Sequence, residues 1–111
     1  MPDRISTYGE FWPFYLREHA KSGTRGIHFA GTFIATASLL VFIATGWLWL
    51  IPVIVVGGYG PAWTAHFFVE KNRPATFKYP LWSLISDYRM AWTWLTGRLS
   101  LELEKAGVPE H

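Results

Sequence analysis

Three histidines are the residues of this sequence whose side chains are best suited to bind a metal ion. His19, His28 and His66 are widely separated along the chain, and neutral imidazoles are common ligands of transition metals. Glu70 follows His66 by four residues, one helical turn further along the same face, which brings a carboxylate near that imidazole. Three imidazoles and one carboxylate, without a thiol, favour iron, zinc, manganese or copper over calcium or magnesium.

The same side chains also have simpler interpretations. A histidine near lipid headgroups can be an amphipathic side chain only, and Glu70 can pair with Lys71 or Arg73. Arg25 and Arg73 are candidates to hold the carboxylate of a fatty acid, although topology and headgroup contacts are the more common role of such arginines. His111 lies in a charged tail and is predicted to have no role.

The histidines can meet only if the apolar middle of the chain folds back on itself. Between Arg25 and Glu70 there is no Lys, Arg, Asp or Glu, and this stretch is long enough for two helical membrane crossings of about 20 residues each. We predict spans at about residues 27–45 and 49–69. One histidine then opens the first span and another closes the second, so both lie near the same face of the membrane.

The second span contains residues that weaken a helix. They are three glycines and a proline, Gly57, Gly58, Gly60 and Pro61. These residues predict a kink or local unwinding near the middle of the span. Gly31 and Ala35 of the first span, facing Gly57 and Gly60, would let the two backbones approach closely. The reversal between the spans is predicted at Thr45-Gly46.

An amphipathic helix is predicted on each side of the hairpin. The first covers about residues 8–22, and its apolar face consists of Trp12, Tyr15, Leu16 and His19. The second covers about residues 81–97, and its apolar face consists of Leu81, Leu84, Ile85, Tyr88, Trp92 and Leu95. Both are predicted to lie at the headgroup boundary. Asp87 and Arg89 argue against a third span, because a charge at the centre of one costs about 2.5–3.5 kcal/mol on insertion scales.

The predicted fold class is therefore an all-α membrane protein, a two-span transmembrane helical hairpin flanked by amphipathic interfacial helices. Residues 1–111 form a single membrane-embedded domain. Basic residues lie at the near ends of both spans, which by the positive-inside rule puts both termini in the cytoplasm. The membrane would be the inner membrane of a bacterium or the endoplasmic reticulum of a eukaryote. The net charge of +2 fits anionic membrane lipid, and no nucleic-acid-reading motif accompanies it.

Several classes of active site are excluded by composition. The chain has no cysteine, so thiolate metal sites and cysteine nucleophiles are absent. Four histidines are too few for the two-metal sites of membrane desaturases and hydroxylases, which sets a ceiling of one metal. No Gly-x-Ser-x-Gly elbow and no phosphate-binding glycine loop occur.

The motifs of the chain resemble those of the membrane 2-hydroxy fatty acid dioxygenase family, long catalogued as a domain of unknown function. The similarity covers about residues 8–97. The residues that carry it are Phe11–Leu16, Glu18-His19, Arg25, His28-Phe29, Gly31, Gly60, Ala62-Trp63, His66-Phe67, Glu70, Asn72 and Pro74-Ala75. The run from His66 to Ala75, with Glu70, Asn72 and Pro74 between, is the most specific part.

This resemblance implies an Fe(II)-dependent enzyme of fatty acid α-oxidation that uses O2 to shorten a 2-hydroxy fatty acid by one carbon. The histidines of the family carry over onto His19, His28 and His66, and its acidic position falls on Glu70, as a fourth ligand or a residue that orients the ligands. A 2-hydroxy acid could chelate the iron through its carboxylate and hydroxyl, with the acyl tail in lipid or between the spans.

Two other functions remain open from the sequence. The first is a non-catalytic membrane interaction or assembly protein in which the histidines only pack. The second is bis-histidine haem binding, for which no supporting spacing is present. A homodimer that encloses the substrate is also compatible with so short a chain.

Overall fold

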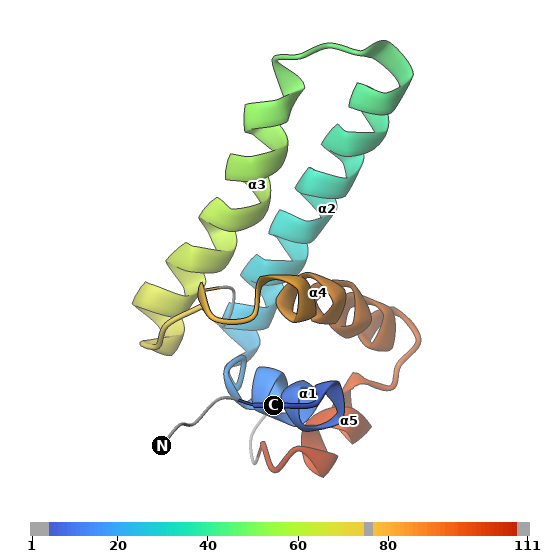
Figure 1. Cartoon of the computed structure of the whole chain (residues 1–111). Helices are drawn as coiled ribbons and strands as arrows, with labels where there is room; N and C mark the ends of the chain where they lie inside the picture. Colours follow the sequence, from blue (N-terminus) through green and yellow to red (C-terminus); the bar gives the residue numbers. More distant parts are fainter. Residues whose placement is uncertain (1–4, 75–76, 109–111) are drawn as a thin grey trace.

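The computed structural model describes residues 5–74 and 77–108, and within these ranges it is all-α with no strand. The α-helices are α1 (Tyr8–Arg17), α2 (Ser22–Thr45), α3 (Leu50–Thr64), α4 (Pro80–Leu95) and α5 (Leu99–Lys105), and a π-helix, η1 (Ala65–Glu70), continues α3. Figure 1 shows α2 and α3 as a long hairpin, with α4 crossing near its open end and α1 and α5 beyond α4. His111 and Ala75 lie outside the described residues.

The hairpin turns where the sequence predicts. α2 ends at Thr45, and Gly46 caps it in the left-handed conformation with φ 72°, which glycine adopts without a steric penalty. The other end of α2 differs from the prediction. The first helix, predicted to continue to about residue 22, stops at Arg17, and α2 begins at Ser22, before the start predicted for the first span at about residue 27.

The two hairpin helices touch through small residues at one level. A Cβ atom at Gly31 would lie 3.0 Å from the carbonyl oxygen of Gly58 and 3.2 Å from that of Gly57, so a side chain there would require the α3 backbone to move by a few tenths of an ångström. Ala35 contacts Gly58, and not Gly60 as predicted. The helix departs from α geometry after Pro61, at η1, and not at the glycines in its middle.

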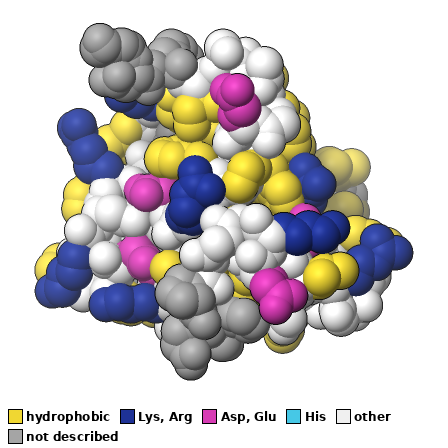
Figure 2. All heavy atoms as spheres, turned by 90° about the horizontal axis from the view of Figure 1, so that it is seen from below, with side chains coloured by type: hydrophobic (Ala, Val, Ile, Leu, Met, Phe, Trp, Pro, Cys, Tyr) yellow, Lys and Arg dark blue, Asp and Glu magenta, His cyan; other side chains and the backbone are white. Residues whose placement is uncertain are grey.

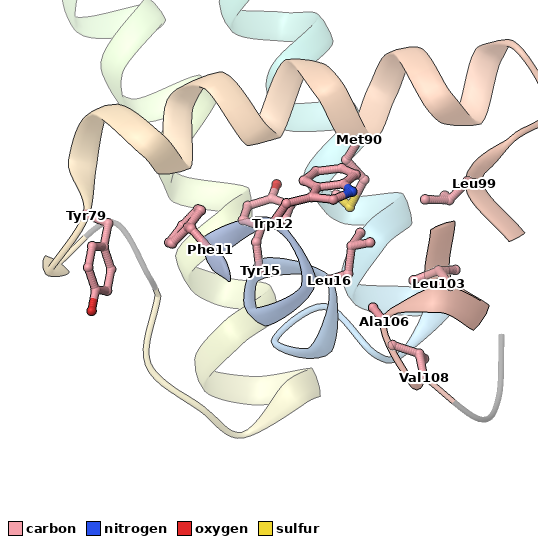
Figure 3. Close-up of a cluster of buried hydrophobic side chains, with 10 residues drawn as sticks. All are labelled: Phe11, Trp12, Tyr15, Leu16, Tyr79, Met90, Leu99, Leu103, Ala106 and Val108. Atoms are coloured by element: carbon pink, nitrogen blue, oxygen red, sulfur yellow. The ribbon is translucent and has the colours of Figure 1, made fainter. Parts of the chain in front are cut away.

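The apolar face of α1 is buried in protein, and not in lipid as the interfacial prediction had it. It joins a core with α4, α5 and the segments that follow α5 and precede α4 (Figure 3). The core consists of Phe11, Trp12, Tyr15, Leu16, Tyr79, Met90, Leu99, Leu103, Ala106 and Val108. The Trp12 indole N–H donates a hydrogen bond to Glu102 at 2.9 Å, and the Arg89 guanidinium lies 4.2 Å from the Trp12 ring.

Helix α4 has its polar face inside and its apolar face outside. Ser83, Ser86, Met90 and Thr93 are buried. The six residues of the predicted apolar face are all exposed, from 44% for Tyr88 to 70% for Leu95. The pattern therefore identified the apolar face of this helix, and the structure leaves that face uncovered.

Among the described helices, α2 is the one whose length and composition suit a membrane crossing. The second predicted span is divided, because α3 has 15 residues and then passes into the six-residue π-helix. Figure 2, which views the molecule from the side opposite the hairpin tip, shows Lys, Arg, Asp and Glu side chains spread over that face.

Gly31 and Gly26 offer a matched test of the helix contact. Substitution of either by alanine gains the same helix propensity, but only at Gly31 does the new methyl group meet backbone oxygens. We expect Gly31→Ala to be about 1–3 kcal/mol less stable than Gly26→Ala, the usual cost of overpacking. Thermal unfolding of the two variants in the same detergent measures the difference, and equal stabilities would contradict the close approach.

Candidate metal centre

Three buried histidines from three different elements meet at the open end of the hairpin. His19 lies two residues beyond α1, His28 is in the second turn of α2, and His66 is in η1. Their exposed fractions are 1%, 6% and 2%, and each ring offers a nitrogen within 4.8 Å of the others. The predicted convergence of the three histidines is thus observed, including that of residues 38 and 47 positions apart in the sequence.

The π-helix determines where His66 points. Single π-turns inside α-helices are rare and often occur at functional sites, because the wider turn shifts the side chains that follow. Here the π-turn begins at Ala65 and ends at Lys71, whose left-handed φ of 68° allows its N–H to bond the carbonyl of His66. Asn72 N–H donates to the same carbonyl at 2.8 Å, which brings its side chain back to the His66 ring.

The hydrogen bonds of His19 and His66 determine which ring nitrogen carries the proton. His19 Nδ1 lies 2.7 Å from the carbonyl oxygen of Tyr15, which can only accept, so Nδ1 is the donor. His66 Nδ1 lies 2.7 Å from Asn72 Oδ1. The orientation of that amide is fixed in turn, because Asn72 Nδ2 donates to the carbonyl of Glu18 at 3.0 Å. Both rings are therefore protonated on Nδ1.

Two nitrogen lone pairs consequently face each other in the buried cluster. His19 Nε2 and His66 Nε2 are 3.0 Å apart, and neither carries a proton to share in the neutral tautomers. Burial, and to a smaller extent the neighbouring His28 and His66, lower the pKa of His19 well below its ordinary value, so a proton does not settle there. A cation is the partner that such an arrangement lacks, and a metal with bonds of about 2.1 Å to nitrogen fits ligand atoms at this spacing.

An acidic residue of α4 lies beside the third ring, that of His28, on the side of its Nδ1 atom. His28 Nδ1 lies 3.5 Å from Asp87 Oδ1, which also accepts a hydrogen bond from the Tyr15 hydroxyl. Burial raises the pKa of Asp87 to about 7, and the bond from Tyr15 partly offsets that rise. Burial also raises the pKa of Tyr15 well above its ordinary value, so its hydroxyl stays a donor. All three rings thus have an oxygen acceptor beside Nδ1, as metal-binding histidines usually do.

Glu70 lies outside the histidine cluster. Its Oε1 accepts hydrogen bonds from the backbone N–H of Lys21 at 3.0 Å and from Thr24 Oγ1 at 2.7 Å. Lys21 is the N-cap of α2, so Glu70 places a negative charge at the positive end of that helix. This contact ties the end of η1 to the start of α2 and so holds His66 and His28 at the same level.

The two arginines predicted for the substrate carboxylate have different surroundings. Arg25 is 4% exposed, and its Nη1 donates to the carbonyls of His19 and Ala20 at 2.8 and 2.9 Å. Arg25 therefore stabilises the turn in which His19 lies. Arg73 is exposed, with its guanidinium 5.5 Å from the Phe77 ring.

Sequence reasoning missed three residues that support the cluster, namely Tyr15, Asn72 and Asp87. Tyr15 was assigned to an apolar face, and Asn72 was noted only as part of the motif. Asp87 had a usable signal, because an ionisable residue in the middle of an apolar helix is a functional candidate by default.

The tautomers can be measured directly. In the metal-free protein with ¹⁵N-labelled histidine, long-range ¹H–¹⁵N correlations at neutral pH should show His19 and His66 neutral and protonated on Nδ1, since their acceptors lie there. A proton on Nε2 of either ring would contradict the facing lone pairs.

Comparison with known proteins gives one match. No curated protein and no solved structure matches the chain significantly. A family model described as 2-hydroxy-palmitic acid dioxygenase Mpo1-like matches residues 5–99, which include all three clustered histidines, Asn72 and Asp87. The chain therefore belongs to the Mpo1-like family of 2-hydroxy-palmitic acid dioxygenases.

Proposed function

We propose that this protein is an Fe(II)-dependent dioxygenase that shortens 2-hydroxy fatty acids by one carbon at a membrane surface. Family membership supports the reaction and the substrate class. The observation that supports metal binding is the pair of facing Nε2 atoms of His19 and His66. Two unprotonated nitrogens 3.0 Å apart in a buried site repel each other, and a shared cation turns that repulsion into binding.

The proposed ligands are His19, His28 and His66, and Glu70 acts as a positioning residue. A carboxylate that already accepts two hydrogen bonds at the start of α2 is better suited to hold the histidines in place than to bind the ion. Iron(II) held by three imidazoles supplies open coordination positions and the redox chemistry that cleavage by O2 requires. Three imidazoles can bind zinc or manganese as well as iron, so the assignment of iron is based on the family.

The residues of the chain orient the reactants and keep water out. Tyr15, Asn72 and Asp87 fix the three rings from behind, which holds each Nε2 toward the centre. Burial of the rings removes competing water from the metal. Arg73 and Arg25 are the cations proposed to attract the substrate carboxylate.

We propose that the hairpin spans the membrane with both termini in the cytoplasm. α3 and η1 together extend from Leu50 to Glu70, which is long enough for a second crossing even though a π-turn interrupts it. The outward residues of α2 and α3 are apolar and exposed, among them Phe33 at 74% and Val56 at 67%. The exposed apolar face of α4 would rest on the same bilayer, with the charged face of Figure 2 toward water.

The membrane would be the inner membrane of a bacterium or the endoplasmic reticulum of a eukaryote, and the whole chain would form one membrane-embedded domain. A substrate with a polar head and an acyl tail would reach a centre at this depth without leaving the lipid.

Metal content tests the ligand set. We expect protein purified without oxygen to hold about one iron per chain, and His66→Ala to hold almost none. Asn72→Ala should weaken metal affinity by about 10–100-fold, the usual effect of losing such an acceptor, whereas Asn72→Asp keeps an oxygen beside Nδ1 and should bind nearly normally. Wild-type protein without stoichiometric iron under these conditions would count heavily against the proposal.

Turnover tests the reaction. We expect the iron-loaded protein in lipid to convert 2-hydroxypalmitic acid and O2 to the acid with one carbon fewer, CO2 and water, and to leave palmitic acid unchanged. Oxygen from ¹⁸O2 should appear in the product. If alanine at all three histidines altered neither metal content nor lipid turnover, the chain would be the non-catalytic membrane protein considered above.

A further inference from the structure

An apolar groove of about 360 Å³ lies between the hairpin and α4. Its lining comes from three helices: Thr32, Ala35 and Leu39 of α2, Ile54, Val55, Gly58 and Tyr59 of α3, and Leu84, Asp87 and Tyr88 of α4. This volume is at the lower end of the range of small-molecule sites. Thr36 and Tyr88 hydrogen-bond through their hydroxyls beside the groove and so tie α4 to α2.

The inner end of the groove is at Asp87, which lies beside the histidine cluster. Asp87 lies in its wall, and the same carboxylate lies 3.5 Å from His28 Nδ1. Tyr15 and His28 both engage Oδ1 of Asp87, which leaves Oδ2 to accept a hydrogen bond from a ligand. The groove thus has one carboxylate at its inner end, and the side chains beyond it are mostly apolar.

The groove extends from that end toward the hairpin tip. His28, Thr32, Ala35 and Leu39 follow each other at spacings of three or four residues along one face of α2, which covers about 16 Å at 1.5 Å per residue. Leu39, Val55 and Leu84 are 41%, 50% and 48% exposed, so the groove is open along its side. In the proposed membrane orientation, that side faces lipid tails.

We propose that this groove binds the acyl chain of the 2-hydroxy fatty acid, which enters sideways from the bilayer, and that Leu39 and Ile54 at its outer end set the preferred chain length. This inference rests on the proposed function. The 2-hydroxyl group donates to Asp87, beside His28, and the chain extends along α2 away from the cluster. A plain fatty acid lacks that donor, so Asp87 Oδ2 accepts no hydrogen bond from it, although Oδ1 keeps its partners Tyr15 and His28.

A photoreactive ligand locates the chain without any turnover. A 2-hydroxy fatty acid with a diazirine near its methyl end is added to the metal-free full-length protein in nanodiscs, and the labelled residues are identified by mass spectrometry. We expect labelling to concentrate at Leu39 and Ile54 and to exceed that by the analogue without the hydroxyl. Leu40 is the next residue of α2 and faces outward. Equal labelling of Leu40 would contradict binding of the acyl chain in the groove.

A pair of tryptophan variants tests the chain-length role. Leu39→Trp fills the outer end of the groove, and Leu40→Trp places the same side chain on the outer surface, where Leu40 is 61% exposed. We expect Leu39→Trp to lose about tenfold in labelling and turnover of the longest accepted chain relative to one two carbons shorter, the effect of leaving two methylene groups unburied. Leu40→Trp should keep the wild-type profile, and a wild-type profile in both variants would overturn the proposal.

The outcomes separate this inference from the proposed function. Wild-type protein that neither holds iron nor turns over substrate contradicts the dioxygenase, whatever the labelling shows. Active, iron-containing protein whose chain-length profile is the same in Leu39→Trp contradicts the groove alone.

Discussion

The hydrogen bonds behind the His19 and His66 imidazoles are the interactions on which the rest of this structure depends. A carbonyl that can only accept fixes the proton of His19 on Nδ1, and an amide held by a second carbonyl does the same for His66. Once those protons are fixed, the two Nε2 lone pairs face each other at 3.0 Å in a buried space. The protonation of the histidine cluster is thus set by neighbouring groups that lie outside it.

These neighbours also hold the fold together. Tyr15 belongs to the core of α1, α4 and α5 and donates to Asp87 of α4. Asn72 follows η1 and bonds to the carbonyl of Glu18, just after α1. Glu70 bonds the start of α2. Each bond joins two elements that differ in sequence position by dozens of residues, and the Thr36–Tyr88 hydrogen bond adds a further link between α2 and α4.

Periodicity and charge predicted the elements well, because both depend on local sequence. The charge-free middle, the turn at Gly46 and the apolar faces of the helices at α1 and α4 were all readable. What each face contacts could not be predicted, because periodicity identifies an apolar face without saying whether protein or lipid covers it. The faces of α1 and α4 have similar patterns, yet one is buried by α4 and α5 and the other is exposed.

The convergence of the three histidines was predictable from the sequence, and the residues that support them were not, for the same physical reason. A hairpin brings its two open ends together whatever its details, so His28 and His66 had to meet. The role of Glu70 depended on a single π-turn, which adds one residue per turn and rotates the following side chains away from the face that α spacing predicts. Asp87 required knowing that the polar side of α4 faces inward.

The burial of three uncharged imidazoles also links metal binding to stability. Two facing lone pairs without a partner cost free energy in the metal-free protein, and an ion that binds only the folded chain recovers that cost. The proposed ligands come from the end of α1, the start of α2 and η1. Metal binding would therefore stabilise the contacts between these elements and not any one helix. The proposed ion would therefore stabilise the arrangement that creates its own site.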